Sequence, residues 1–298
     1  MKSFKGRTAV ITGAASGFGL ETARVAAREG MNVVMADVQA DALDAAAAEI
    51  AGLGAQVLAQ RVDVSKAAEV DALAAATFAR FGAPHFVFNN AGVGAGGLVW
   101  ETSLRDWDWV LGVNVMGVVH GVRTFVPAML DAARADAGYE GHVVNTASMA
   151  GLLNPPNMGV YNVSKHAVVS LSETLHQDLA LVTDQVSASV LCPYFVATGI
   201  SHSERNRPQA EGAPLTRSQQ IQQAMIQKAV GAGKVSAAQV AQFVFDALRE
   251  RRFYVFSHPH ALRNVQSRME DILGARNPSD PFAERPELGE QLRASLRK

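Results

Sequence analysis

The sequence predicts a doubly wound α/β fold, in which helices cover both faces of a mostly parallel sheet. Short runs rich in valine alternate with alanine-rich helical stretches along the first two-thirds of the chain. The short runs are apolar on both faces, which is typical of parallel strands that have helices on either side. This alternation with short connections favours repeated strand–helix–strand units over an antiparallel sheet.

Each element follows from the same pattern. Strands are expected at residues 8–11, 32–36, 56–62, 85–89, 142–146, 186–191 and 252–256. Helices are expected at residues 18–29, 41–51, 67–80, 104–133, 159–182, 216–230 and 237–251. Residues 1–257 are therefore predicted to form one catalytic domain.

The chain changes character after residue 191. Residues 197–215 are polar and contain two prolines and several charges, which is typical of a mobile loop beside a ligand. We expect residues 197–235 to form a substrate loop and a lid helix within the domain. Residues 258–298 are expected to be an extension, with one amphipathic helix followed by a surface tail.

The composition excludes several classes of function. The 298 residues are 48% hydrophobic and 18% charged, with a net charge of -1 and no basic run, so no nucleic-acid partner is expected. No apolar run is long enough for a bilayer and no signal-peptide core is present, so we expect a cytoplasmic protein with no membrane partner. Cys192 is the only cysteine, and the histidines lack partners at metal-ligand spacing, so no metal site is expected.

A glycine-rich turn lies between the first strand and the first helix, with the sequence TGAASGFG at residues 12–19. Glycines at 13, 17 and 19 allow a tight turn and let the backbone approach a pyrophosphate, whose charge the helix N-terminus favours. A purely structural turn is the alternative. A strand before, a helix after and an acid at the end of the next strand together favour dinucleotide binding.

Asp37 is that acid. Its carboxylate can accept hydrogen bonds from the adenosine ribose hydroxyls, and it would repel a 2′-phosphate. An acidic cap for the following helix is the alternative interpretation. Because no Lys or Arg lies in the glycine turn or directly after Asp37, the sequence predicts NAD as the cofactor and not NADP.

Tyr161 and Lys165 are four residues apart in a helical stretch, so they lie on one face. A tyrosine has a pKa of about 10, and a nearby ammonium lowers that pKa by favouring the phenolate. Tyr161 can then act as general base on an alcohol, or as general acid to a ketone. The spacing alone is a weak signal, because it often arises by chance.

Two further polar residues strengthen the interpretation. Ser148 follows a predicted strand thirteen residues before Tyr161, where its hydroxyl can hold a substrate oxygen. Asn114 lies in an otherwise apolar helical stretch, so it either bonds a backbone group or serves a water chain.

These residues together resemble the short-chain dehydrogenase/reductase family. The shared features are the glycine turn, Asp37, the pair Asp63–Val64, the run NNAG at 89–92, Asn114, Ser148, and the tyrosine–lysine pair. The resemblance covers about residues 5 to 257 and implies a seven-stranded Rossmann-like sheet and hydride transfer between nicotinamide and a carbonyl carbon.

The resemblance also implies roles for individual residues. The catalytic set would be Asn114, Ser148, Tyr161 and Lys165, with Tyr161 as the acid/base and Lys165 holding the nicotinamide ribose. Asn114 would position a water, and Asn90 would stabilise the central strand. The cofactor would contact Gly13, Ser16, Gly17, Phe18, Gly19, Asp37, Asp63, Val64, Asn90, Ala91, Gly92, Tyr161, Lys165, Pro193, Val196 and Thr198.

One position departs from the family pattern. Pro193 is followed by Tyr194 where the family usually has glycine, while Val196 and Thr198 remain. The aromatic ring can either narrow the substrate pocket or pack elsewhere, and the sequence leaves both open.

The expected function is that of an oxidoreductase acting on a hydrophobic secondary alcohol or ketone, aromatic substrates included. A catalytically silent NAD-binding regulator or scaffold is one alternative, and an epimerase or dehydratase on the same fold is another. The family resemblance implies a homodimer or homotetramer.

Overall fold

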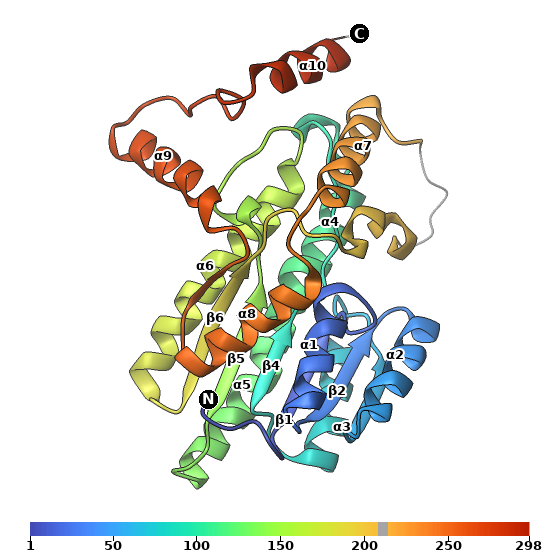
Figure 1. Ribbon diagram of the computed structural model, residues 1–298, viewed down its shortest axis with the longest axis vertical. Coiled ribbons are helices and arrows are strands. Elements are labelled where there is room, and N and C mark those ends of the chain that lie inside the picture. Colours follow the sequence, from blue (N-terminus) through green and yellow to red (C-terminus); the bar gives the residue numbers. More distant parts are fainter. Residues whose placement is uncertain (208–213, 298) are drawn as a thin grey trace.

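Seven parallel strands form a single sheet in the computed structural model (Figure 1). The structure describes residues 1–207 and 214–297, so residues 208–213 of the expected substrate loop lie outside the described part. The strands are β1 (Thr8–Thr12), β2 (Asn32–Asp37), β3 (Val57–Arg61), β4 (Phe86–Asn89), β5 (Gly141–Thr146), β6 (Val186–Cys192) and β7 (Tyr254–Phe256). The doubly wound, seven-stranded Rossmann-like fold is confirmed, with all its strands parallel.

Helices cover both faces of the sheet, as the apolar strands require. One face carries α1 (Gly17–Arg28), α2 (Ala40–Gly52) and α8 (Ala237–Glu250) around one apolar core. The other carries α3 (Ala67–Phe81), α5 (Gly117–Ala135) and α6 (Gly159–Val182) around a second core. As a result β1, β4 and β5 are buried along their whole length.

The strands lie in the order β3-β2-β1-β4-β5-β6-β7. Successive strands β2 and β3 are added on one side of β1, and β4 to β7 are added on its other side, so the order of addition changes side between β1 and β4. The helices that follow these two strands pack on opposite faces of the sheet. A crevice therefore opens beyond the carboxyl ends of β1 and β4, which is where open α/β sheets bind ligands. The turn after Thr12 and the segment after Asn89 both begin at this crevice.

The long helix expected at residues 104–133 is interrupted. A π-helical turn, η2 (Gly112–Met116), joins α4 (Leu104–Leu111) to α5 and contains Asn114. Such turns are frequent at functional sites. The whole stretch Leu104–Ala135 is long and apolar enough to cross a membrane, but 50% of its apolar window is buried inside the fold, and the core helix of a globular protein passes the same test.

The C-terminal extension differs from the expectation in its last part. A helix, α9 (Leu262–Leu273), forms where the apolar periodicity predicted one. The segment expected to be a surface tail contains another helix, α10 (Pro286–Leu296), because Leu292 finds a buried position and proline suits a first helical turn. Figure 1 shows α9 and α10 standing apart from the sheet, with α10 beside α7 (Arg217–Gly231).

Candidate active site

The glycine-rich turn joins β1 to α1 at the crevice. Gly13 and Gly17 have φ angles of 65° and 54°, a region that glycine adopts without steric cost. Gly19 packs so closely that a Cβ atom there would lie 2.0 Å from the carbonyl oxygen of Gly13. Ser16, the N-cap residue of α1, makes no capping bond through its side chain. The first N–H groups of α1 therefore keep their capacity to bind an anion.

Asp37 ends β2 and bonds two different segments. Its Oδ2 accepts the N–H of Ala15 in the glycine turn at 3.0 Å, and its Oδ1 accepts the N–H of Gln39 at 3.0 Å. The second contact lies just before α2, whose N-cap residue is Gln39 and not Asp37. The first contact fixes the carboxylate beside the glycine turn, where an adenosine ribose would lie if the turn holds a pyrophosphate.

Asn90 connects the ends of three strands. Its Nδ2 donates to the carbonyl oxygen of Thr12 at 3.0 Å, and its Oδ1 accepts the hydroxyl of Thr146 at 3.3 Å. The Thr12 hydroxyl oxygen accepts the backbone N–H groups of Asn90 and Ala91 at 2.9 and 3.1 Å. The carboxyl ends of β1, β4 and β5 are thus held together at the floor of the crevice. Thr146 is a cavity-lining residue that sequence reasoning missed, although it lies at a strand end.

Tyr161 and Lys165 lie on the first turns of α6, and both are buried. The Lys165 Nζ donates to the carbonyl oxygen of Thr146 at 2.9 Å and lies 5.7 Å from the centre of the Tyr161 ring. Burial raises the pKa of Tyr161 to about 12, while the nearby Ser148 hydroxyl acts on that pKa in the opposite direction. Burial also lowers the pKa of Lys165 to about 8. The tyrosine pKa is therefore raised by desolvation, and not lowered as expected from the neighbouring ammonium.

Asn114 is completely buried in the π-helical turn. Its Oδ1 accepts the N–H of Val93 at 2.8 Å, while its Nδ2 donates to the Val93 carbonyl and the Ser164 hydroxyl, each at 3.0 Å. Of the two roles considered from the sequence, the structure shows the bond to the backbone. A Cβ atom on Gly92 would lie 3.3 Å from the Asn114 Oδ1 and 3.5 Å from the Lys165 Nζ. Asn114 is thus part of the packing directly around the lysine.

One cavity of about 930 Å³ lies over the crevice. Most of the predicted site residues line it, namely Gly13, Ser16, Gly17, Phe18, Asp37, Asp63, Val64, Asn90, Ala91, Gly92, Tyr161, Lys165, Pro193 and Thr198. Gly19, Asn114, Ser148 and Val196 are not among its lining residues. Gly19 packs against Gly13 of the glycine-rich turn, and Asn114 lies close to Lys165 outside the cavity. The Ser148 hydroxyl donates a hydrogen bond to the carbonyl oxygen of Pro193 at 3.3 Å.

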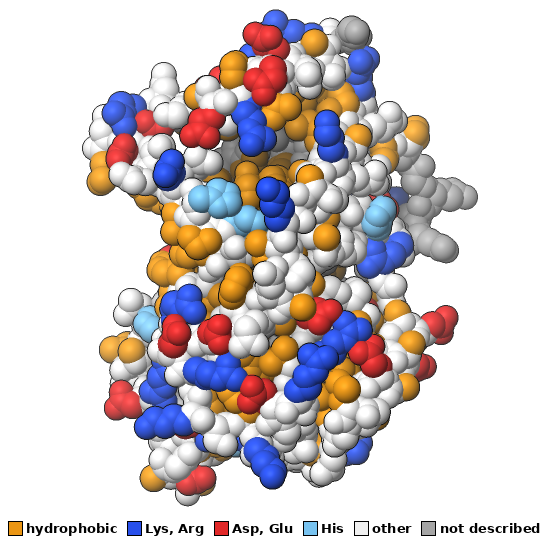
Figure 2. Space-filling view, in the orientation of Figure 1, with side chains coloured by type: hydrophobic (Ala, Val, Ile, Leu, Met, Phe, Trp, Pro, Cys, Tyr) orange, Lys and Arg blue, Asp and Glu red, His pale blue; other side chains and the backbone are white. Residues whose placement is uncertain are grey.

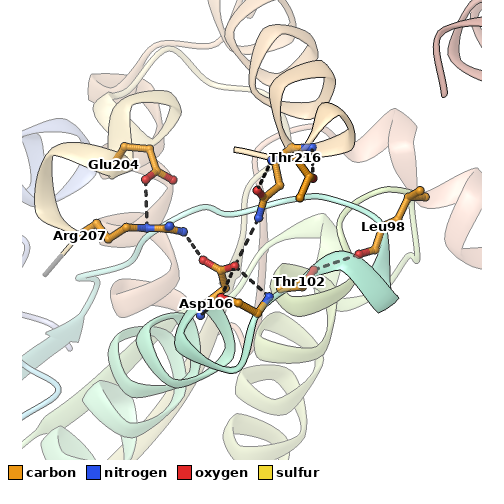
Figure 3. Close-up of polar contacts among 8 residues, drawn as sticks. Leu98, Thr102, Asp106, Glu204, Arg207 and Thr216 are labelled. Atoms are coloured by element: carbon orange, nitrogen blue, oxygen red, sulfur yellow. Dashed lines mark hydrogen bonds and ion pairs between the residues drawn. The ribbon is translucent and has the colours of Figure 1, made fainter. Parts of the chain in front are cut away.

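The outer wall of the cavity comes from two segments after β6, which we call the lid. They are η4 (Gly199–Asn206) with Arg207, and α7. The Ser203 hydroxyl oxygen accepts the N–H of Gly94 at 2.9 Å, which joins η4 to the loop after β4. Figure 3 shows Asp106 of α4 between Arg207 and the beginning of α7. Sequence reasoning missed Asp106 and Ser203, because neither belongs to a local motif.

The family model described as short chain dehydrogenase matches residues 7–209. The chain is a short-chain dehydrogenase. This family membership agrees with the resemblance noted in the sequence, and it makes the chain an oxidoreductase by family.

Relatives match the dehydrogenase over nearly all of its length. A CLA biosynthesis dehydrogenase/reductase of Lactiplantibacillus plantarum is 34% identical over 279 residues, which are 92% of this chain and 95% of the relative. A 1-deoxy-11-beta-hydroxypentalenate dehydrogenase of Streptomyces exfoliatus is 37% identical over 89% of this chain and 88% of the relative. A short-chain dehydrogenase/reductase of Burkholderia phymatum, solved in complex with NAD, is 52% identical with a TM-score of 0.91, covering 95% of this chain and 100% of that one.

Tyr194, where the dehydrogenase departs from the family pattern, packs near the surface. Its ring centre lies 4.3 Å from that of Phe195 and 5.9 Å from that of His258, and its side chain is 37% exposed. Its N–H donates to the Ser257 hydroxyl at 3.0 Å. The ring therefore packs against the segment that leads into the C-terminal extension, and it is not among the residues that line the cavity.

Replacing Asn114 tests the packing around the lysine. In Asn114→Ala the buried N–H and carbonyl of Val93 lose their partners, so we expect the free energy of unfolding to fall by about 2 kcal/mol. Urea unfolding of both proteins measures it. An unchanged unfolding free energy would contradict the role given to the asparagine.

Proposed function

We propose that this short-chain dehydrogenase transfers a hydride between NAD(H) and a hydrophobic secondary alcohol or ketone, with Tyr161 as its acid/base. The observation that carries the proposal is that Tyr161 and Lys165 line the same cavity as the glycine turn and Asp37. A proton-transfer group and a dinucleotide cradle thus face one space. Reaction at a carbonyl carbon needs both of them together.

The cradle fits a dinucleotide. No side chain larger than that of glycine can occupy position 19, and the open N–H groups of α1 suit a pyrophosphate. Asp37 offers carboxylate oxygens at the end of β2, which favours the ribose of NAD over the 2′-phosphate of NADP. The solved relative with bound NAD supports this assignment. When bound, the nicotinamide supplies the hydride donor or acceptor.

Tyr161 is the residue that transfers the proton to or from the substrate oxygen. With its pKa raised to about 12 the phenol is protonated near neutral pH, so it is ready to donate a proton to a ketone oxygen. In the oxidation direction the same oxygen must first lose its proton. Ser148 is proposed to hold the substrate oxygen, which requires its hydroxyl to leave the carbonyl oxygen of Pro193. Lys165, held by Thr146 at 2.9 Å, carries a positive charge near the ring below its pKa of about 8.

The substrate is proposed to be apolar. Ile200, Val93 and Leu215 contribute aliphatic side chains to the cavity. The relative named for 1-deoxy-11-beta-hydroxypentalenate supports a hydroxylated carbon skeleton as substrate class. The cytoplasmic location, the homo-oligomer, and the division into residues 1–257 and an extension at 258–298 stay predictions.

A screen of secondary alcohols with NAD tests the proposed function directly. We expect NADH to form with apolar alcohols and to disappear with the matching ketones. Tyr161→Phe should lose at least about a hundredfold in turnover, since it removes the general acid, while NADH binding followed by fluorescence stays near that of the wild type. Comparable turnover by the variant would contradict the acid/base role.

The pH dependence should differ between the two directions. Oxidation needs the phenolate of Tyr161, so below its pKa of about 12 the kcat/KM for an alcohol should rise as the pH is raised from 6 to 7.5, a range in which Lys165, with a pKa of about 8, stays mostly charged. Reduction needs the phenol, so kcat/KM for the ketone should not rise over that range. Steady-state rates in both directions measure the two profiles. An oxidation rate that falls with rising pH would overturn the assignment.

Asp37 should govern the choice of cofactor. In Asp37→Asn the negative charge is removed while the side chain keeps its size, so the preference for NAD over NADP should shrink by about tenfold, or about 1.4 kcal/mol. The ratio of the two kcat/KM values measures it, with the thermal midpoint showing whether the bonds to Ala15 and Gln39 are lost. A wild-type protein that prefers NADP would contradict the role of Asp37.

A further inference from the structure

Asp106 is a buried carboxylate under the lid, eight residues before Asn114. It lies in the first turn of α4, and its side chain is 4% exposed. Its Oδ2 accepts the N–H and the hydroxyl of Ser103 at 3.1 and 2.8 Å, which caps the helix. Capping carboxylates usually face solvent, because a helix end satisfies its N–H groups at the surface. This one is covered by the lid (Figure 3).

Both parts of the lid bond to this carboxylate. Arg207, directly after η4, forms an ion pair with Oδ1, and the Gln219 Nε2 in the first turn of α7 donates to Oδ2 at 3.3 Å. Arg207 is itself fixed by an ion pair with Glu204 at 3.0 Å and lies 5.1 Å above the centre of the Trp109 ring. One side chain of α4 therefore holds two segments that are separated from it by about a hundred residues.

The underside of α7 is polar where it meets the body of the protein. The Ser218 hydroxyl accepts the N–H of Leu98 at 3.0 Å and donates to Glu101 at 2.6 Å. The Asn157 Nδ2 donates to the Ser218 carbonyl at 3.0 Å. Gln222 is also buried, and a Cβ atom on Gly96 would lie 2.1 Å from its Cγ. Water can replace such hydrogen bonds, so this contact is one that can open and close.

Figure 2 shows a hollow in the upper part of the molecule, with hydrophobic side chains inside it. The cofactor cavity itself is lined by the lid and by α4, since Arg207, Gln219 and Asp106 belong to the same lining as Asp37 and Lys165. A dinucleotide in this cavity would lie behind the lid. Opening the lid over it would break the bonds to Asp106.

We propose that Asp106 is a positioning residue that anchors the lid through Arg207 and Gln219 and slows the release of NAD(H). The inference rests on the proposed NAD-dependent function. Without Arg207, the closed lid would bury the Asp106 charge uncompensated, whereas an open lid would expose it to water. The closed state would therefore lose stability relative to the open one.

The dissociation rate of NADH tests the anchor without knowledge of the substrate. NADH bound to the full-length protein is displaced by excess NAD in a stopped-flow fluorimeter. Arg207→Gln and Asp106→Asn should each release NADH about tenfold faster than the wild type, which corresponds to about 1.4 kcal/mol. Arg207→Lys keeps the charge and should restore part of the slow release. The double variant should release NADH little faster than either single one, because both remove the same ion pair.

Ser103→Ala is the matched control. It removes a partner of Asp106 in the helix cap but leaves the bonds to Arg207 and Gln219 in place. We expect a lower thermal midpoint with NADH release within about twofold of the wild type. Release as fast as in Arg207→Gln would show that the effect comes from α4 and would overturn the proposal.

The remaining outcomes distinguish a failure of the lid anchor from a failure of the proposed NAD-dependent function. Tight NADH binding with unchanged release from both Arg207→Gln and Asp106→Asn would overturn the anchor alone. A wild-type protein that binds no NADH would overturn the NAD-dependent function and the anchor with it.

Discussion

The buried ammonium of Lys165 sets the main constraint on this active site. A charge that is 2% exposed must have hydrogen-bond partners, and the carbonyl oxygen of Thr146 supplies one at 2.9 Å. That carbonyl is available because Thr146 is the last residue of β5, one residue beyond the end of the ladder to β4. The lysine therefore has to sit at the carboxyl edge of the sheet. The start of α6, and Tyr161 with it, is fixed in the same place.

The strand ends around the lysine are held by polar side chains instead of apolar packing. Thr12 and Asn90 exchange bonds that join the ends of β1 and β4, and Asn90 reaches Thr146 on β5. At the crevice between β1 and β4 the helices diverge to opposite faces, so no helix covers these groups. Short polar side chains can satisfy the exposed strand ends while leaving room for a ligand. The same opening that admits a cofactor thus explains the amide and hydroxyl residues found there.

The sequence predicted the elements best where local pattern decides the structure. Strands that are buried on both faces appear in the sequence as continuous apolar runs. The observed strands begin and end within about two residues of the predicted ones, which is a usual difference for element boundaries. The π-helical turn at Gly112–Met116 was not predicted, because the partners of Asn114 include the backbone of Val93 on another segment. The helix α10 was missed for a similar reason: its Leu292 becomes buried only through tertiary contacts.

The candidate site divides in the same way. Residues that belong to the turn, to a strand end or to one helix face have spacings that the sequence displays, and most of them meet in one cavity. Asp106 and Arg207 have no such spacing, since 101 positions separate them and either would read as an ordinary surface charge. The dinucleotide cradle is rigid because close contact fixes it, as at Gly19 against Gly13. The lid is held by an ion pair and by hydrogen bonds from side-chain amides, and the strength of both depends on the exclusion of water. A rigid cradle with a polar lid that can separate from it allows a tightly held cofactor to exchange. Only the residues of the cradle form a local motif that can be recognised in a single sequence.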